Sequence, residues 1–207
     1  MDTRQRSTQD RIIDGLIQCI KEKPVQEITN KDIYTKGEVT YQTFFRYYSD
    51  KNELLDDLEN TLISELQSAQ KHDRDSLTQL KHAPDEDEIL TLSASEFKNT
   101  LSFCDKYQTI LRALLSSHGD LLFVRRIQNV AEKEFIIRAR YFSGSRKLTV
   151  KESLFIRTYV TQVVTLIESW LFFCDDISQK SITEIIGKAQ IMSPIEILRA
   201  ESKEMAE

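Results

Sequence analysis

Hydrophobic residues recur at intervals of three and four along most of this chain, which is the spacing of one face of an α-helix. The first such stripe lies between about residues 7 and 22, and Pro24 ends it. The most regular stripe lies in the second half, between Ile156 and Cys174. With five Gly and three Pro in 207 residues, long segments contain no helix breaker. The pattern therefore predicts an all-α protein.

The helical stripes fall into two groups, separated by a polar segment. Residues 67–88 contain few apolar side chains, and we expect them to hold the end of a long helix that begins near Asp50, followed by a connection. Four helices before this segment are expected to form a small bundle. A second helical bundle is expected after it, in which Gly119 ends one helix.

Residues 29–55, TNKDIYTKGEVTYQTFFRYYSDKNELL, read as two short helices joined by a tight turn, followed by the start of the long helix. Thr29 and Asp32 predict a capping box, and Thr40 is predicted to cap the second helix. That second helix carries amide, hydroxyl, guanidinium and phenol groups. These groups make contacts with phosphates and base edges in protein–DNA complexes, so this helix is a candidate DNA reader.

This segment resembles the helix-turn-helix of TetR-family transcriptional regulators, whose pattern is roughly T-x-x-x-I-A followed by A-G-V-S-x-x-T-L/F-Y-x-Y/H-F-x-S/N-K-x-x-L-L. The matching residues are Thr29, Ile33, Val39, Thr40 (for Ser), Thr43, Phe44, Tyr47, Lys51, Leu54 and Leu55. Upstream, residues 11–16, RIIDGL, stand where the family has R-I-L-D-A-A. Two residues differ from the pattern. Glu38 replaces the usual turn glycine, with Gly37 one position earlier, and Phe45 replaces a tyrosine whose hydroxyl often faces DNA.

The resemblance implies a three-helix DNA-binding domain over residues 1–55. It also implies a helical regulatory and dimerisation domain over residues 56–207, with the long fourth helix as the link. Such regulators are cytoplasmic bacterial homodimers that bind a palindromic operator in double-stranded DNA, most often as repressors, and a small-molecule effector releases them. Their last two long helices pair with those of the second copy. A transcriptional activator of the same fold is the nearest alternative.

The resemblance also assigns roles to single residues of the two short helices. Lys31, Tyr41 and Gln42 are the predicted base-edge contacts, since Gln can pair with adenine and Lys can reach guanine. The predicted phosphate contacts are Thr29, Asn30, Thr43, Arg46, Tyr47 and Lys51. Thr40 and Phe45 complete the predicted DNA-facing set, whereas Phe44 and Tyr48 occupy core positions of the pattern. The alternative for the exposed residues is a solvated helix face.

The charge distribution modifies this picture only slightly. Residues 1–51 hold nine Lys and Arg against eight Asp and Glu, a net charge of +1, whereas the remainder holds 19 against 25, a net charge of −6. Local placement must therefore supply the positive face that attracts phosphate. Arg4 and Arg6 either form an arm that reaches a minor groove or belong to a disordered terminus.

Aromatic residues among the later helices are candidates for the effector pocket, because helical bundles bind small molecules between their helices. The candidates are Phe103, Tyr107, His118, Phe123, Tyr159 and Trp170. The alternative for each is core packing or, for Tyr159 and Trp170, a dimer interface. A mostly apolar or aromatic effector is expected, since no cluster of Arg and Lys suggests a phosphate site. The stripe from Val160 to Ile167 is expected to meet, in part, the same stripe of a second copy.

Other classes of protein are less well supported. An enzyme would need converging acid, base or nucleophile groups, and the sequence contains no GxSxG, HExxH or glycine-rich phosphate loop. Neither a metal nor a cofactor is expected, because Cys19, Cys104 and Cys174 lie far apart and lack zinc spacing. Buried reduced thiols are expected, with a redox sensor as the alternative. A helical interaction adaptor without DNA binding also stays open, because of Glu38 and Phe45.

The start of the chain and its hydropathy favour a cytosolic protein. No segment reaches the apolar length of a membrane span, and MDTRQRSTQD lacks the apolar region of a signal peptide. We therefore expect no membrane partner.

Overall fold

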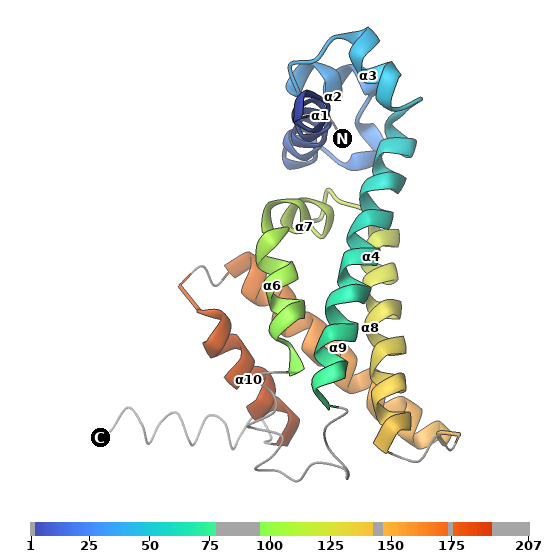
Figure 1. Ribbon diagram of the computed structural model, residues 1–207, viewed down its shortest axis with the longest axis vertical. Helices are drawn as coiled ribbons and strands as arrows, with labels where there is room; N and C mark the ends of the chain where they lie inside the picture. The colour runs from blue at the N-terminus through green and yellow to red at the C-terminus, as the bar shows by residue number, and fades with distance from the viewer. Residues whose placement is uncertain (1–2, 78–95, 143–146, 174–175, 192–207) are drawn as a thin grey trace. The chain divides into compact units, whose positions relative to one another are not determined.

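The computed structural model describes residues 3–77, 96–142, 147–173 and 176–191, and these residues form α-helices and one 3-10 turn without any β-strand among them (Figure 1). The predicted all-α fold is thereby confirmed. No helix of these four stretches combines the length and the apolar character that a bilayer crossing needs. The elements are α1 (Thr3–Glu22), η1 (Val25–Glu27), α2 (Asn30–Lys36), α3 (Tyr41–Tyr47), α4 (Lys51–Leu77), α6 (Lys98–Lys106), α7 (Gln108–Leu114), α8 (Leu121–Phe142), α9 (Val150–Phe173) and α10 (Gln179–Ile191).

The chain packs into two compact units, and α4 and α8 each contribute to both. The first unit comprises residues 1–65 and 107–127, and so contains α1 to α3, the start of α4, α7 and the first turns of α8. The second comprises residues 66–106 and 128–207 and contains α6, α9, α10 and the rest of α4 and α8. The domain division at residue 55, which the family resemblance implies, stays a prediction.

The core of the first unit follows the predicted stripe of α1. Ile12, Leu16 and Ile20 are at most 1% exposed, and their spacing of four residues places them on one helix face. The backbone of α1 approaches α2 very closely at Gly15. A Cβ atom there would lie 2.7 Å from the Gly37 nitrogen and inside contact distance of the Ile33 carbonyl oxygen. The absence of a side chain at Gly15 therefore allows the backbones of α1 and α2 to pack this closely.

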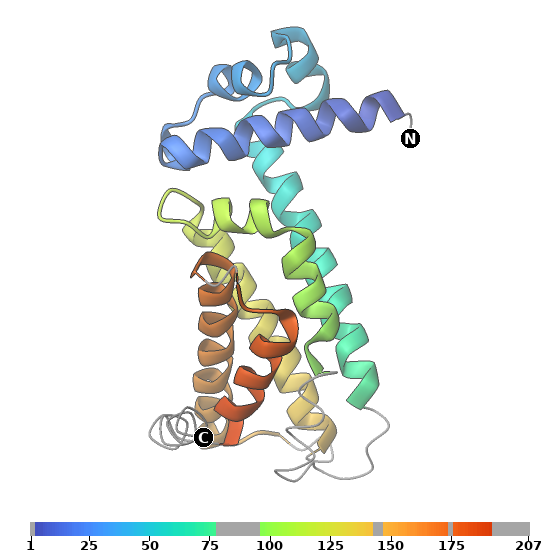
Figure 2. The same ribbon diagram turned by 90° about the vertical axis from the view of Figure 1, so that its left-hand side faces the viewer.

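The segment between α7 and α8 is hydrogen-bonded to η1, just after α1. Helix α7 ends at Leu114, so the prediction that Gly119 ends this helix is wrong. Gly119 lies where the chain returns past the Leu114 carbonyl, which a Cβ atom would overlap, and this carbonyl accepts from the Asp120 N–H at 3.0 Å. The return brings the His118 carbonyl 2.8 Å from the Val25 nitrogen. Figure 2 shows α7 alongside α1 in this unit.

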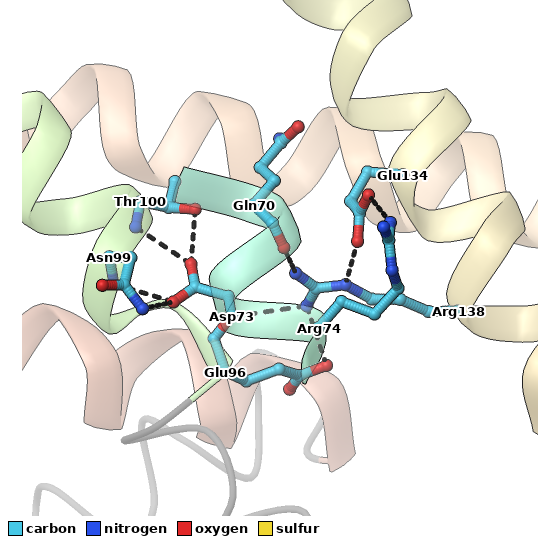
Figure 3. A network of polar contacts seen from close by, with 8 residues as sticks. All are labelled: Gln70, Asp73, Arg74, Glu96, Asn99, Thr100, Glu134 and Arg138. Atoms are coloured by element: carbon cyan, nitrogen blue, oxygen red, sulfur yellow. Dashed lines mark hydrogen bonds and ion pairs between the residues drawn. The ribbon is translucent and has the colours of Figure 1, made fainter. Parts of the chain in front are cut away.

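A buried polar network holds the second unit together (Figure 3). Asp73 of α4 is fully buried and caps α6, accepting hydrogen bonds from the backbone N–H groups of Asn99 at 2.7 Å and Thr100 at 2.9 Å. The Asn99 amide and the Thr100 hydroxyl donate to the same carboxylate. The negative charge at the first turn of α6 is favourable, because the N–H groups there have no partner within the helix.

Arg138 forms the other half of this network. Its Nε donates to Glu134 at 3.0 Å, and its Nη atoms reach the Gln70 carbonyl at 3.4 Å and the Glu96 carboxylate at 3.3 Å. Arg74 of α4 donates to the second oxygen of Glu134. At least two hydrogen bonds each on Arg138 and Glu134 compensate the removal of these charges from water, and removing one member would leave its partner buried and unpaired. The network therefore fixes α4, α8 and the start of α6 within the second unit.

Candidate nucleic-acid interface

Side-chain caps define the start of both short helices, as the sequence predicts. The Thr29 N–H donates to Asp32 at 2.8 Å and the Asp32 N–H donates to the Thr29 hydroxyl at 3.2 Å, which confirms the capping box of α2. The Thr40 hydroxyl accepts from the Thr43 N–H at 3.1 Å at the start of α3. A hydrogen bond from Lys23, together with those of Thr29, lowers the pKa of Asp32 to about 2.

The turn between these helices places a non-glycine residue in the left-handed region. Glu38 has a φ of 48°, whereas Gly37 has a φ of −74° and lies in the ordinary helical region. Gly37 is needed for a different reason, since a Cβ atom there would lie 3.2 Å from the Arg11 carbonyl carbon and closer still to its oxygen. Arg11 donates to the Glu38 carbonyl and lies 3.7 Å from its carboxylate. Arg11 thus stabilises a backbone conformation at residue 38 that Glu seldom adopts.

Helix α3 has one buried face and one exposed face. Phe44 and Tyr48 are 0% and 5% exposed, so both lie in the core as the pattern predicts. On the other face Tyr41 is 60% exposed and Phe45 37%, and their ring centroids are 4.5 Å apart. The paired rings hold each other in place on the surface.

Polar groups share this exposed face with the two rings. Gln42 and Arg46 are exposed, and Thr43 and Tyr47 are half-buried. The Arg46 guanidinium lies 5.2 Å from the centre of the Tyr47 ring, a cation–π contact that orients a charge without burying it. Tyr34 of α2 packs edge-on against Tyr41 at 6.1 Å and so supports the same surface. Sequence reasoning missed Tyr34, because one tyrosine in a short polar helix carries no signal of its own.

Asn30 and Lys51 make internal bonds in this structure. The Lys51 ammonium donates to the carbonyls of Val25 at 2.8 Å and Gln26 at 3.3 Å, and the Lys51 N–H donates to the Asn30 side chain at 2.7 Å. These bonds join η1, α2 and the first residue of α4. Contact of Thr29, Asn30 and Lys51 with phosphate stays a prediction, and so does contact of Lys31 with a base edge. Thr29 and Lys31 are both exposed.

Acidic groups limit the interface on the α4 side. A cavity of about 610 Å³ lies beside the end of α3. Its lining includes Tyr47, Tyr48, Asp50, Glu53, Asp56 and Asp57. Burial raises the pKa of Tyr48, whose hydroxyl donates to Asp57 at 3.4 Å. Carboxylates repel phosphate, so this side of the first unit is unfavourable for a polyanion.

The six predicted effector contacts are divided between the two units. Tyr107, His118 and Phe123 belong to the first unit, and Phe103, Tyr159 and Trp170 belong to the second. Phe103, Phe123 and Trp170 are core residues, and the Trp170 indole donates to the Ile177 carbonyl at 2.7 Å. Whether any of the six binds an effector stays a prediction.

Within the described residues no group of His, Cys, Asp and Glu could hold a metal ion. Cys19 and Cys104 are buried, and burial raises the pKa of the Cys104 thiol to about 12. A thiol that resists ionisation is a poor redox sensor, because the thiolate is the reactive form. Cys174 lies outside the described residues.

Comparison with known proteins identifies the fold. No family model matches the chain, and no curated protein matches it. A solved TetR transcriptional regulator from Streptococcus agalactiae 2603V is similar over 90% of this chain and 94% of its own, with 19% identity and a TM-score of 0.54. A TetR transcriptional regulator from Rhodococcus sp. RHA1 matches 91% of this chain and 94% of its own, with 15% identity and a TM-score of 0.43. The likeness to the streptococcal structure, joined to the helix-turn-helix of α2 and α3, shows that this chain has the fold of the TetR transcriptional regulators.

Proposed function

We propose that this protein is a TetR-type transcriptional regulator that acts as a repressor, as most members of that family do. It binds a palindromic operator as a homodimer and is released by a small-molecule effector. The observation that carries the proposal is the exposed face of α3. Tyr41, Gln42 and Arg46 stand on that face while Phe44 and Tyr48 anchor the helix in the core. Residues at the start of a recognition helix reach base edges when the helix enters the major groove.

Direct readout by Gln42 is the sharpest part of this proposal. Gln42→Ala should lower affinity for the operator by about 1–3 kcal/mol and relax base preference at one position of each half-site, because a bidentate contact with adenine is lost. Arg46→Ala should weaken operator and unrelated duplex alike and lower the salt dependence, because it removes a phosphate contact. The measurement is a fluorescence-anisotropy titration with palindromes from the region upstream of the gene.

Gln18→Ala, at an exposed glutamine of α1, is the control for the loss of an amide and should leave both affinities unchanged. Equal, sequence-independent losses for Gln42→Ala and Arg46→Ala would contradict the assignment of Gln42. No binding to any upstream palindrome at low salt would favour the interaction adaptor, for which the strained Glu38 turn is the supporting observation.

The homodimer has a candidate surface on α9. Val160 and Val163 are buried within their own unit, so they are unavailable to a second copy, and Ile167 is half-buried. The large apolar side chains that stay exposed in the first turns of α9 are Val150 at 79%, Leu154 at 60% and Phe155 at 65%. Adjacent exposed apolar residues mark an interaction surface. The proposed dimer therefore uses this end of α9 rather than the buried part of the stripe.

The proposed effector has a candidate contact in the second unit. The Tyr159 hydroxyl is buried, and no described group bonds to it. The ring packs edge-on against Phe135 at 5.0 Å, and burial raises the pKa of the hydroxyl well above its ordinary value. A buried hydroxyl without a partner needs a ligand or an ordered water. An apolar or aromatic effector with one hydrogen-bonding group meets this need, and thermal-shift screening of apolar and anionic metabolites tests it.

A further inference from the structure

Four aromatic rings of α2 and α3 form one closed cluster in the first unit. Tyr34 packs edge-on against Tyr41, with ring centroids 6.1 Å apart. The Tyr41 ring lies 4.5 Å from that of Phe45, which packs edge-on against Phe44 at 5.3 Å. The Phe44 ring in turn lies 6.3 Å from that of Tyr34. Each ring therefore contacts two others, and Phe44, which is 0% exposed, anchors the cluster in the core.

The outer part of this cluster is a small apolar surface in a fixed orientation. Tyr41 is 60% exposed and Phe45 is 37% exposed, although their ring neighbours hold both of them. The two residues are four positions apart, so they are adjacent on one side of α3. Folding has already restricted these side chains, so a ligand that contacts them does not have to order them first. Tyr41 thus presents a rigid ring at the first residue of α3.

The surroundings of this surface favour DNA over a protein partner. Helix α3, with the sequence YQTFFRY, contains no acidic residue. Gln42 and Arg46 are exposed beside the two rings. A surface of two rings is small for a protein interface, which needs a wider apolar centre. An amide and a guanidinium next to a small apolar surface match the major groove, where base edges that form hydrogen bonds lie beside the C5-methyl group of thymine.

We propose that the Tyr41 ring reads the C5-methyl group of a thymine in the operator, and that Tyr34 and Phe45 are positioning residues for that ring. This inference rests on the proposed function and specifies which base the exposed face of α3 recognises. Phe45 suits its role because it lacks the hydroxyl of the tyrosine in the family pattern, so its ring offers only apolar surface to Tyr41. Thymine is the base that presents an apolar group in the major groove.

The test replaces thymine by deoxyuridine, which keeps the hydrogen-bonding groups of thymine and lacks only the methyl group. The probe is the upstream palindrome that the wild type binds most tightly, with symmetric thymine pairs replaced one pair at a time. Replacement at one pair should weaken binding about fourfold for each methyl group, or about fifteenfold for the pair. Tyr41→Ala should bind both probes equally, whereas Tyr41→Phe should retain the full difference, because the ring and not the hydroxyl contacts the methyl group.

The ratio of the two affinities also tests the positioning residues, because a loss of folded protein affects both probes alike. Phe45→Ala should reduce the ratio, since the Tyr41 ring loses its nearest neighbour, and the conservative Phe45→Tyr should retain it. The matched control is Leu122→Ala, at a residue of α8 that is 65% exposed in the same unit, and it should change neither the affinities nor their ratio. A cluster with only a structural role would leave the ratio unchanged in every variant.

The outcomes separate this inference from the proposed function. If the wild type binds an upstream palindrome and no deoxyuridine pair weakens binding, the methyl readout is wrong and the proposed function stands. A folded Tyr41→Ala variant that retains the full ratio would show that another residue reads the methyl group. If the wild type binds none of the upstream palindromes, the proposed function fails and the methyl readout fails with it.

Discussion

At the turn between α2 and α3, Glu38 has a φ of 48°, a conformation that glycine adopts without strain. Glu38→Gly should therefore raise the free energy of unfolding by about 0.5–1 kcal/mol, even though glycine also makes the unfolded chain more flexible. The bond from Arg11 to the Glu38 carbonyl is retained, and the exposed ion pair that is lost contributes little. Urea unfolding measures the change.

The control for this substitution is Glu27→Gly in η1. Glu38 is the non-glycine residue with positive φ in the described part of the chain, so Glu27 gains no relief of strain from glycine. The control should lower stability by about 0.5–1 kcal/mol. A stability loss of similar size for both variants would show that the Glu38 conformation carries no strain.

Glu59 of α4 makes the first unit sensitive to pH. Burial, and then the nearby Asp120 carboxylate, raise the pKa of Glu59 to about 7, although Arg126 donates to it at 2.8 Å. Its second oxygen is buried and has no partner in the described structure. Between the ordinary carboxyl pKa and about 7 the folded state binds more protons than the unfolded chain. Stability should therefore fall as pH rises through this window and level off above it.

Glu59→Gln should remove this pH dependence, because its side chain is neutral at every pH and its carbonyl can still accept from Arg126. The variant should exceed the wild type by about 1–3 kcal/mol at pH 8 and match it near pH 5. Urea unfolding at both pH values measures this, with Glu184→Gln, at an exposed residue of α10, as the control. A variant that is equally or less stable than wild type at pH 8 would show that Glu59 is well satisfied when ionised.

At the scale of elements, the contact between α1 and α2 depends on two glycines. Gly15→Ala would stabilise an isolated helix by about 1 kcal/mol, since alanine has the higher helix propensity. Here we expect a loss of roughly 1–3 kcal/mol, because the new Cβ atom would lie 2.7 Å from the Gly37 nitrogen and α2 would have to move. Urea unfolding measures the loss, and Gln18→Ala on the exposed face of α1 should be nearly neutral. A gain in stability for Gly15→Ala would show that the helices can separate without cost.

Local elements could be predicted from sequence because their signals are local. The capping box of Thr29 and Asp32 spans three residues, and the burial of Phe44 and Tyr48 follows from the spacing of the helix-turn-helix pattern. The end of α7 could not be predicted, because Gly119 serves a close approach to the Leu114 carbonyl rather than a helix end.

Contacts between elements far apart in the chain could not be predicted from the sequence. Asp73 caps a helix 26 residues further along the chain, and Arg138 reaches the Gln70 carbonyl 68 residues before it. The predicted role of Lys51 was drawn from its place in the motif. Its bonds to the Val25 and Gln26 carbonyls require η1 to lie beside the start of α4, and no local sequence pattern predicts this contact.

At the scale of the whole molecule, α9 shows how far a hydrophobic stripe can be interpreted. The stripe predicts the helix, and its buried part includes Val160, Val163, Trp170 and Leu171. Periodicity alone cannot tell which apolar residues face their own core and which face a second copy. That distinction came from exposure, because Leu154 and Phe155 lie on the surface of the same helix.

The dimer provides the prediction at this scale. Phe155→Glu should shift the protein from dimer to monomer without unfolding it, because Phe155 is 65% exposed in the isolated chain and a glutamate there is solvated until a second copy covers it. Covering the charge without a partner is strongly unfavourable. Sedimentation equilibrium measures the change, and circular dichroism checks that helix content is retained. Leu121→Glu, at a residue 74% exposed in the first unit, carries the same new charge and should remain dimeric.

Operator binding should fall with dimer formation, since two reading helices must enter successive major grooves about 34–36 Å apart or a multiple of that spacing. Phe155→Glu should therefore lose affinity for the full palindrome while it retains wild-type affinity for a half-site. Ile167→Glu separates the two candidate surfaces, because Ile167 belongs to the half-buried part of the stripe. If Ile167→Glu is a folded monomer while Phe155→Glu remains a dimer, the interface follows the stripe and the exposed first turns of α9 have another role.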